Sequence, residues 1–78
     1  MQSKMIRLSN LHKGDSAIIE SFSDDRMKQK LLEMGCLPGE TIKIDRFAPL
    51  GGPMAIQINN SMLGIRMDEA EAIFVKRI

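Results

Sequence analysis

The sequence predicts a mainly β domain: a small, strongly curved sheet of five or six antiparallel strands with one inserted short α-helix. Several stretches alternate apolar and polar residues with a period of two, and one stretch repeats apolar residues with the period of a helix. At 78 residues the chain has the length of one domain, so we expect a single domain over residues 1–78. Such a sheet usually closes into a partly open barrel, although an αβ sandwich fits the same elements almost as well.

Alternation with a period of two is typical of half-buried antiparallel strands. In residues 41–47, Ile42 and Ile44 point to one face and polar residues alternate with them. The predicted strands are residues 16–22, 41–47, 54–58, 62–67 and 73–78. Asn tolerates left-handed backbone, so the pair Asn59 and Asn60 predicts a tight hairpin between the third and fourth of these strands.

The helical stretch is marked by Met27, Leu31 and Met34, which recur at i, i+4 and i+7 and predict a helix over about residues 24–34. Gly35 follows and suits the left-handed position just past a helix. A helix of about three turns is marginal alone, so its apolar face must dock on the sheet. Candidates for the N-cap are Ser23, Asp24 and Asp25.

The charge balance limits the class of partner. Eleven Lys and Arg face ten Asp and Glu, which gives a net charge of +1. A dedicated nucleic-acid binder usually carries a basic excess, and three Phe without Trp or Tyr offer little base stacking, so we expect no nucleic-acid partner. No apolar run approaches the roughly 18 residues that span a bilayer. We therefore expect a cytoplasmic protein without direct membrane insertion.

Catalytic residue types are sparse. Nucleophilic catalysis needs a nucleophile, a base and an orienting group in one cleft, and His12 and Cys36 are the only candidates. Neighbouring acids occur at 24–25 and 68–71, and the latter fall in a short helical turn expected over residues 68–72. Helix starts favour acids for electrostatic reasons, so these clusters do not indicate acid–base catalysis. We expect no enzyme activity and no catalytic residues.

Metal ligation has two weak candidates, His12 and Cys36, and no close His or Cys spacing supports them. A lone Cys is most often a small buried hydrophobe, and a lone His at a turn is most often solvated. Of the seven Met residues, Met27 and Met34 fall on the helix stripe and Met54, Met62 and Met67 in strand alternation, so they are better explained as core filling. We expect no firm cofactor, with weak binding of Fe²⁺ or another divalent transition metal left open.

Two apolar segments lie at predicted corners. Leu32 falls off the apolar stripe of the helix, Leu37 and Pro38 follow shortly after, and residues 49–53 form a second apolar loop with no charge. Exposed apolar segments on a small domain indicate a partner surface. The alternative is that these loops pack on each other and close the barrel end. Small domains expose much apolar area, so the two interpretations are balanced.

These loops also carry a resemblance to a known family. The matching segments, in order, are LSNLHKGD (8–15), LLEMGCLPG (31–39), RFAPLGGP (46–53), IRMDEA (65–70) and IFV (73–75). Their order and spacing resemble the FeoA family, the small cytosolic accessory proteins of bacterial ferrous iron uptake. The resemblance spans residues 8–75. It implies an SH3-like small barrel and a partner, FeoB, the membrane ferrous iron transporter with a cytosolic GTP-binding domain.

One position departs from the family pattern. The family usually has an apolar residue, often Leu, where this chain has Cys36. That departure favours a buried apolar role for Cys36 over a metal role. The resemblance assigns no site to His12.

The sequence thus favours an accessory protein that binds the cytosolic side of FeoB. The alternative is a small transition-metal-binding sensor or chaperone. Apolar loop character, not the family, predicts the contact residues: Leu32, Leu37, Pro38, Pro49, Leu50 and Pro53, with Arg66 as a polar anchor. Weak self-association stays open.

Overall fold

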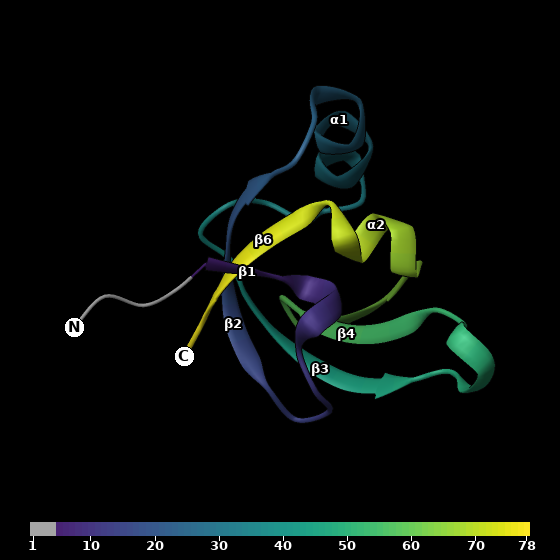
Figure 1. Ribbon diagram of the computed structural model, residues 1–78. Coiled ribbons are helices and arrows are strands. Elements are labelled where there is room, and N and C mark those ends of the chain that lie inside the picture. Colours follow the sequence, from purple (N-terminus) through teal and green to yellow (C-terminus); the bar gives the residue numbers. More distant parts are fainter. Residues whose placement is uncertain (1–4) are drawn as a thin grey trace.

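A computed structural model of the chain describes residues 5–78. They form one six-stranded antiparallel sheet with the order β1-β6-β2-β3-β4-β5. The strands are β1 (Met5–Arg7), β2 (Ser16–Phe22), β3 (Thr41–Phe47), β4 (Met54–Ile58), β5 (Ser61–Ile65) and β6 (Ile73–Arg77). The helices are α1 (Asp25–Glu33), α2 (Met67–Glu71) and the 3₁₀ turns η1 (Leu8–Asn10) and η2 (Pro49–Gly51). The predicted mainly β class with one inserted helix is confirmed (Figure 1).

The core lies inside the curl of the sheet, where the alternate residues of each strand meet. In β3, Ile42 and Ile44 are buried while Thr41, Lys43 and Asp45 are exposed, as the period of two predicts. Register shifts between Ile19 and Ser21 in β2, and in β3 after Ile44, mark irregularities that sharpen the coiling of the sheet. The strong curvature therefore follows from local backbone insertions as well as from strand twist.

The barrel is closed by helical elements rather than by strand pairing. β1 and β5 stand at the two ends of the strand order, and α2, which follows β5, contacts η1, which follows β1. Leu8 of η1 and Ala70 of α2 are fully buried there. β1 was not predicted from the sequence, because a strand of three residues is too short to show a period.

The β4–β5 hairpin matches its prediction. Asn59 and Asn60 both have positive φ, 49° and 64°, and Ile58 pairs with Ser61 across the turn. This geometry is that of a two-residue turn whose twist suits a hairpin. The strand predicted over residues 62–67 is β5 and ends earlier, because the chain leaves the sheet to begin α2.

Helix α1 has well-defined caps at both ends. The Asp24 carboxylate accepts a hydrogen bond from the Met27 backbone N–H at 2.7 Å. At the other end Gly35 has φ +99°, and the Cys36 N–H donates to the Leu31 carbonyl at 2.9 Å. This arrangement satisfies the last carbonyls of the helix and brings Leu31 and Cys36, both fully buried, into the core together.

A substitution at the helix end tests this account. We expect Gly35→Ala to lower the free energy of unfolding by about 1 kcal/mol, because Ala at positive φ is strained. The matched control is Gly64→Ala in β5, where a Cβ would meet nothing within 4 Å and no positive φ is required. Urea denaturation measures both variants. Equal stability changes in the two would contradict the role assigned to Gly35.

Candidate interaction surface

The predicted contact residues form two groups at opposite ends of β3, not one surface. Leu37 and Pro38 precede the start of β3, whereas Leu50 follows its end. A strand of seven residues is roughly 20 Å long, so a partner must be large to touch both groups at once. Figure 1 shows the same separation, with α1 at one end of the fold and η2 at the tip of the β3–β4 hairpin.

We call Leu32, Leu37 and Pro38 the helix-end group. The Leu37 residue is 45% exposed and Pro38 is exposed, but Leu32 is half-buried against the domain. The loop that carries them is fixed: the Gly39 N–H donates to the Ile19 carbonyl at 2.8 Å. These residues are therefore presented on an ordered corner.

A hollow of about 250 Å³ adjoins the end of α1. Met34 and Gly35 form one wall, and Ile58 and Leu63 contribute apolar side chains to the other. The Asn59 side-chain amide, also in the lining, donates to the Glu40 carboxylate at 2.7 Å. This hollow leaves no signal in the sequence, because its walls come from segments far apart in the chain.

We call Pro49, Leu50, Pro53 and Arg66 the hairpin-tip group. The pairing of Met54 with Ile65 brings their neighbours Pro53 and Arg66 close together at the start of the β4–β5 ladder. The Leu50 side chain is fully exposed, at 104% of its reference area. The alternative that the apolar loops cover one another does not hold for the two exposed leucines, which lie at opposite ends of β3.

Phe47 also belongs near this tip and was missed by the sequence analysis. It is the last residue of β3 and is 38% exposed. The register shift in β3 after Ile44 changes the phase of the strand, which sequence alternation alone cannot reveal.

Glu69 is the one buried charged residue among residues 5–78, at 3% exposure. One carboxylate oxygen lies 2.8 Å from Lys30 Nζ, and the other accepts a hydrogen bond from the Arg66 backbone N–H at 2.9 Å. Burial pushes the pKa of Glu69 upward, but the hydrogen bonds from Lys30 and Arg66 outweigh it and hold the pKa below its ordinary value. The carboxylate thus links α1 to the start of α2.

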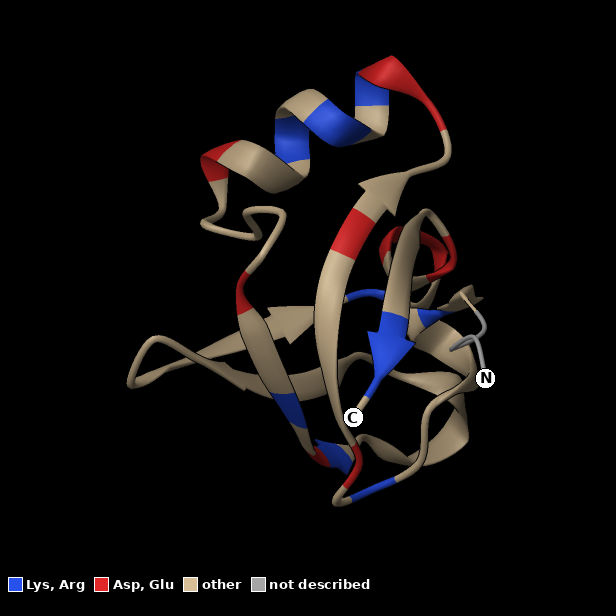
Figure 2. Ribbon diagram, turned by 90° about the vertical axis from the view of Figure 1, so that its left-hand side faces the viewer, with Lys and Arg blue, Asp and Glu red and all other residues tan. Residues whose placement is uncertain are grey.

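Asp15 is a second acidic residue whose carboxylate contacts other segments of the chain. Its carboxylate accepts a hydrogen bond from the His12 backbone N–H at 2.8 Å and lies 3.3 Å from Arg77 Nη2. The His12 N–H is the main cause that lowers the pKa of Asp15. The rest of the surface mixes both signs, as Figure 2 shows along α1, in agreement with the small net charge.

The two weak metal candidates are not brought together. The His12 side chain is 84% exposed, with Nδ1 3.7 Å from an Asp15 oxygen, whereas Cys36 is fully buried. Burial raises the pKa of the Cys36 thiol, and the charge of Glu69 adds to the rise. Metals bind the thiolate, which this environment disfavours. Across residues 5–78, no three His, Cys, Asp or Glu side chains are grouped as metal ligands.

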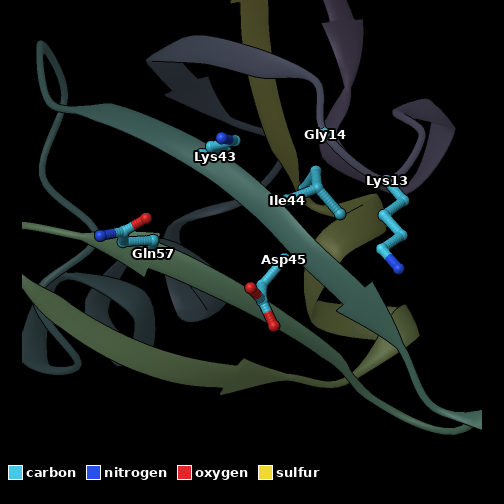
Figure 3. A pocket seen from close by; sticks show the side chains of 6 residues that line it. All are labelled: Lys13, Gly14, Lys43, Ile44, Asp45 and Gln57. Carbon is cyan, nitrogen blue, oxygen red and sulfur yellow. The ribbon is translucent and has the colours of Figure 1, made fainter.

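A shallow hollow of about 250 Å³ lies on the outer face of β3 (Figure 3). Lys13, Lys43, Asp45 and Gln57 supply its polar side chains. In Figure 3 these side chains point in different directions and do not converge on a common point. A catalytic site brings its functional groups together at one point. The side chains of this hollow carry opposite charges and do not converge, so the hollow does not resemble a catalytic site.

Neither α1 nor α2, the α-helices of the described chain, is long and apolar enough to cross a bilayer.

Fold and surface together define a small SH3-like barrel that presents exposed apolar corners. Residues 6–77 match the family model described as the FeoA domain, and the chain belongs to this family. A Porphyromonas gingivalis protein, described as an Fe(2+) transport protein A/Fe(2+) transporter FeoB fusion protein, is 35% identical over 74 residues. The match covers 94% of this chain and only 9% of that protein.

Two solved structures extend the comparison. The FeoA protein from Chlorobium tepidum is 35% identical with a TM-score of 0.83, over 94% of this chain and 70% of that chain. Stenotrophomonas maltophilia FeoA complexed with zinc is 29% identical with a TM-score of 0.76, over 90% of this chain and 88% of that chain. The latter is described as a prokaryotic SH3 domain protein, which supports the barrel class predicted from the sequence.

Removing the Lys30 charge tests the buried ion pair. We expect Lys30→Met to lower the free energy of unfolding by about 1–2 kcal/mol at neutral pH, because Glu69 stays buried without its partner. The pKa of Glu69 is depressed in the folded protein, so its stabilisation is present above the ordinary Glu pKa. It is lost as pH falls through the folded pKa.

The difference in the free energy of unfolding between the parent and Lys30→Met should therefore be constant above about pH 5 and shrink in more acidic solution. Denaturant unfolding at a series of pH values measures it. Lys28→Met is the matched control, since Lys28 is an exposed residue of the same helix and makes no ion pair within residues 5–78. A pH-independent difference would show that the ion pair is not its cause.

The environment of Cys36 predicts slow thiol chemistry. We expect a thiol reagent to label the folded protein at least about tenfold more slowly than the protein in urea, because the thiol is buried and its pKa is raised. Labelling followed by mass spectrometry measures the two rates. Equal rates would mean that Cys36 is accessible in the folded state and available for metal or disulfide chemistry.

Proposed function

We propose that the chain is a non-catalytic accessory protein of bacterial ferrous iron transport that acts in the cytoplasm by binding the cytosolic side of a FeoB-type transporter. The observation that carries this proposal is the Porphyromonas gingivalis fusion, in which a related FeoA sequence and FeoB form one polypeptide. Fusion holds two proteins at a high effective concentration, which favours a contact that is weak when they are separate.

The surface supports a binding role of this kind. The helix-end group and the hairpin-tip group both expose large apolar side chains on ordered corners. Each group holds only three or four residues, whereas a stable interface involves roughly 20–30 residues a side. A transient, regulated contact suits surfaces of this size better than a permanent complex.

The Lys30–Glu69 pair gives the helix-end group a fixed position. The pair joins α1, which leads into this group, to α2, which begins next to Arg66 of the hairpin-tip group. The ion pair therefore helps to fix the positions of the two groups relative to each other. A single large partner such as a GTP-binding domain can contact one or both.

Binding experiments with single charge substitutions test the proposal. We expect the parent protein to bind the purified cytosolic domain of the FeoB-type transporter from the same genome. Leu37→Glu probes the helix-end group and Leu50→Glu probes the hairpin-tip group, because a charge at a desolvated contact weakens binding at least about tenfold. Titration calorimetry or biolayer interferometry measures the affinities.

Met62→Glu is the control for exposed apolar character, since Met62 is 52% exposed and belongs to neither group. Failure of the parent to bind the cytosolic domain would contradict the proposed function. Binding that survives both Leu37→Glu and Leu50→Glu would leave the function standing and overturn the assignment of the surface.

A second candidate function, a transition-metal-binding sensor or chaperone, is favoured by one observation: the Stenotrophomonas maltophilia relative was solved with zinc. In this chain the exposed His12 lies beside the partly exposed Asp15, with Nδ1 3.7 Å from an Asp15 oxygen. Two ligands make a weak site for Fe²⁺ or Zn²⁺. Micromolar binding abolished by His12→Ala would support this candidate, and metal indifference of the parent would remove it.

A further inference from the structure

Leu50 combines full exposure with an unfavourable backbone conformation. Its φ and ψ are 59° and 38°, the left-handed region. Among residues 5–78, every other residue with positive φ is Gly or Asn, such as Gly51 beside it or Asn59 and Asn60 in the next hairpin. A Leu in this region is strained, whereas Gly or Asn would be accepted there with little or no strain.

The hairpin around Leu50 holds the conformation in place. The Ala48 N–H donates to the Pro53 carbonyl at 2.9 Å, and the Gly52 N–H donates to the Pro49 carbonyl at 3.2 Å. Both prolines restrict their own φ. A Cβ on Gly52 would lie only 2.9 Å from the Ala48 Cβ, so the two ends of the loop pass very close together. Leu50 therefore projects from a tight loop whose conformation is constrained by two backbone hydrogen bonds and two prolines.

The Leu50 side chain is fully exposed and buries no area among residues 5–78, so its own packing contributes nothing against the strain. Strained backbone persists at sites where a contact or a function depends on it. We propose that Leu50 is a preorganised anchor that inserts into an apolar pocket on the cytosolic part of the transporter. This inference rests on the proposed function and names the side chain that carries most of its affinity.

The shape and charge of the tip favour a pocket on a protein. A single protruding side chain is complementary to a concave site, and buried apolar anchors of this kind dominate many interfaces. A fixed side chain also loses little conformational entropy on binding. Arg46, a cation near the tip, is flanked by an acid: its Nε lies 3.9 Å from an Asp45 oxygen. The tip thus lacks the basic excess that attracts anionic lipid.

Substitutions that fit left-handed backbone separate a functional role from a structural one. Leu50→Gly removes the anchor and the strain together, so we expect binding to the transporter's cytosolic domain to weaken at least about tenfold. We expect the Tm to stay equal or rise by about 2–6 °C in the same variant. A side chain that packs within the domain would give the opposite change in Tm.

Two further variants complete the series. Leu50→Asn keeps the preference for positive φ without the apolar side chain, so we expect it to lose affinity as Leu50→Gly does. Leu50→Met keeps an apolar side chain of similar size, so we expect affinity within about threefold of the parent. Met62→Gln, at an exposed apolar site outside the tip, is the control and should leave binding unchanged.

Each contrary result overturns a definite part of the proposal. If the parent binds and Leu50→Gly binds equally well, the anchor is wrong and the proposed function stands. If the parent does not bind, both fail. A fall in Tm of Leu50→Gly by several degrees overturns the strain argument.

Other occupants of the tip are tested directly. Flotation with vesicles of phosphatidylglycerol and phosphatidylcholine that carries the parent but not Leu50→Gly would assign the tip to a lipid surface. Sedimentation that depends on concentration in the parent but not in Leu50→Gly would assign it to a second copy of the chain. Either result overturns the proposal of a pocket on the transporter.

Discussion

The buried carboxylate of Glu69 joins the two parts of the fold that the strand pairing leaves separate. The sheet alone leaves a gap between β1 and β5, which α2 and η1 cover, and it leaves α1 as an appended helix. Glu69 lies in α2, takes a hydrogen bond from the backbone where α2 begins and forms an ion pair with Lys30 of α1. A buried charge is tolerated only when such partners satisfy it. The closing helix and the inserted helix therefore constrain each other's position.

A rigid frame of this kind explains why exposed apolar residues can persist on so small a domain. The corner that exposes Leu37 is held by a backbone hydrogen bond to β2, and the loop that exposes Leu50 is held by two backbone hydrogen bonds within residues 48–53. A fixed apolar side chain meets a partner without a large loss of conformational entropy. The same side chain on a mobile loop would add more to non-specific association than to recognition.

Local sequence signals predicted the elements that local chemistry controls. Gly35 and the Asn59–Asn60 pair take the left-handed conformations expected of them, and the alternation in 41–47 buries its isoleucines. The Lys30–Glu69 pair was not predictable, because no periodicity relates residues in different elements. Nor was the left-handed residue of the tip: Pro and Gly marked a turn, but turn propensity does not select Leu. The opposite placement of the two apolar groups depends on topology, which alternation alone does not fix.

The conformation of Leu50 also bears on how the stability of the chain is distributed. A domain of this size has an unfolding free energy of roughly 4–12 kcal/mol, and one left-handed Leu forfeits about 1–2 kcal/mol of it. Asn in the next hairpin shows that the chain accommodates residues suited to this backbone where a turn is the only requirement. At the tip the side chain contributes no burial in return. The hydrogen bonds and prolines of the loop bear this cost, so the fold tolerates a strained Leu but gives no reason for Leu in place of Asn or Gly; a contact with a partner is the reason that our proposal supplies.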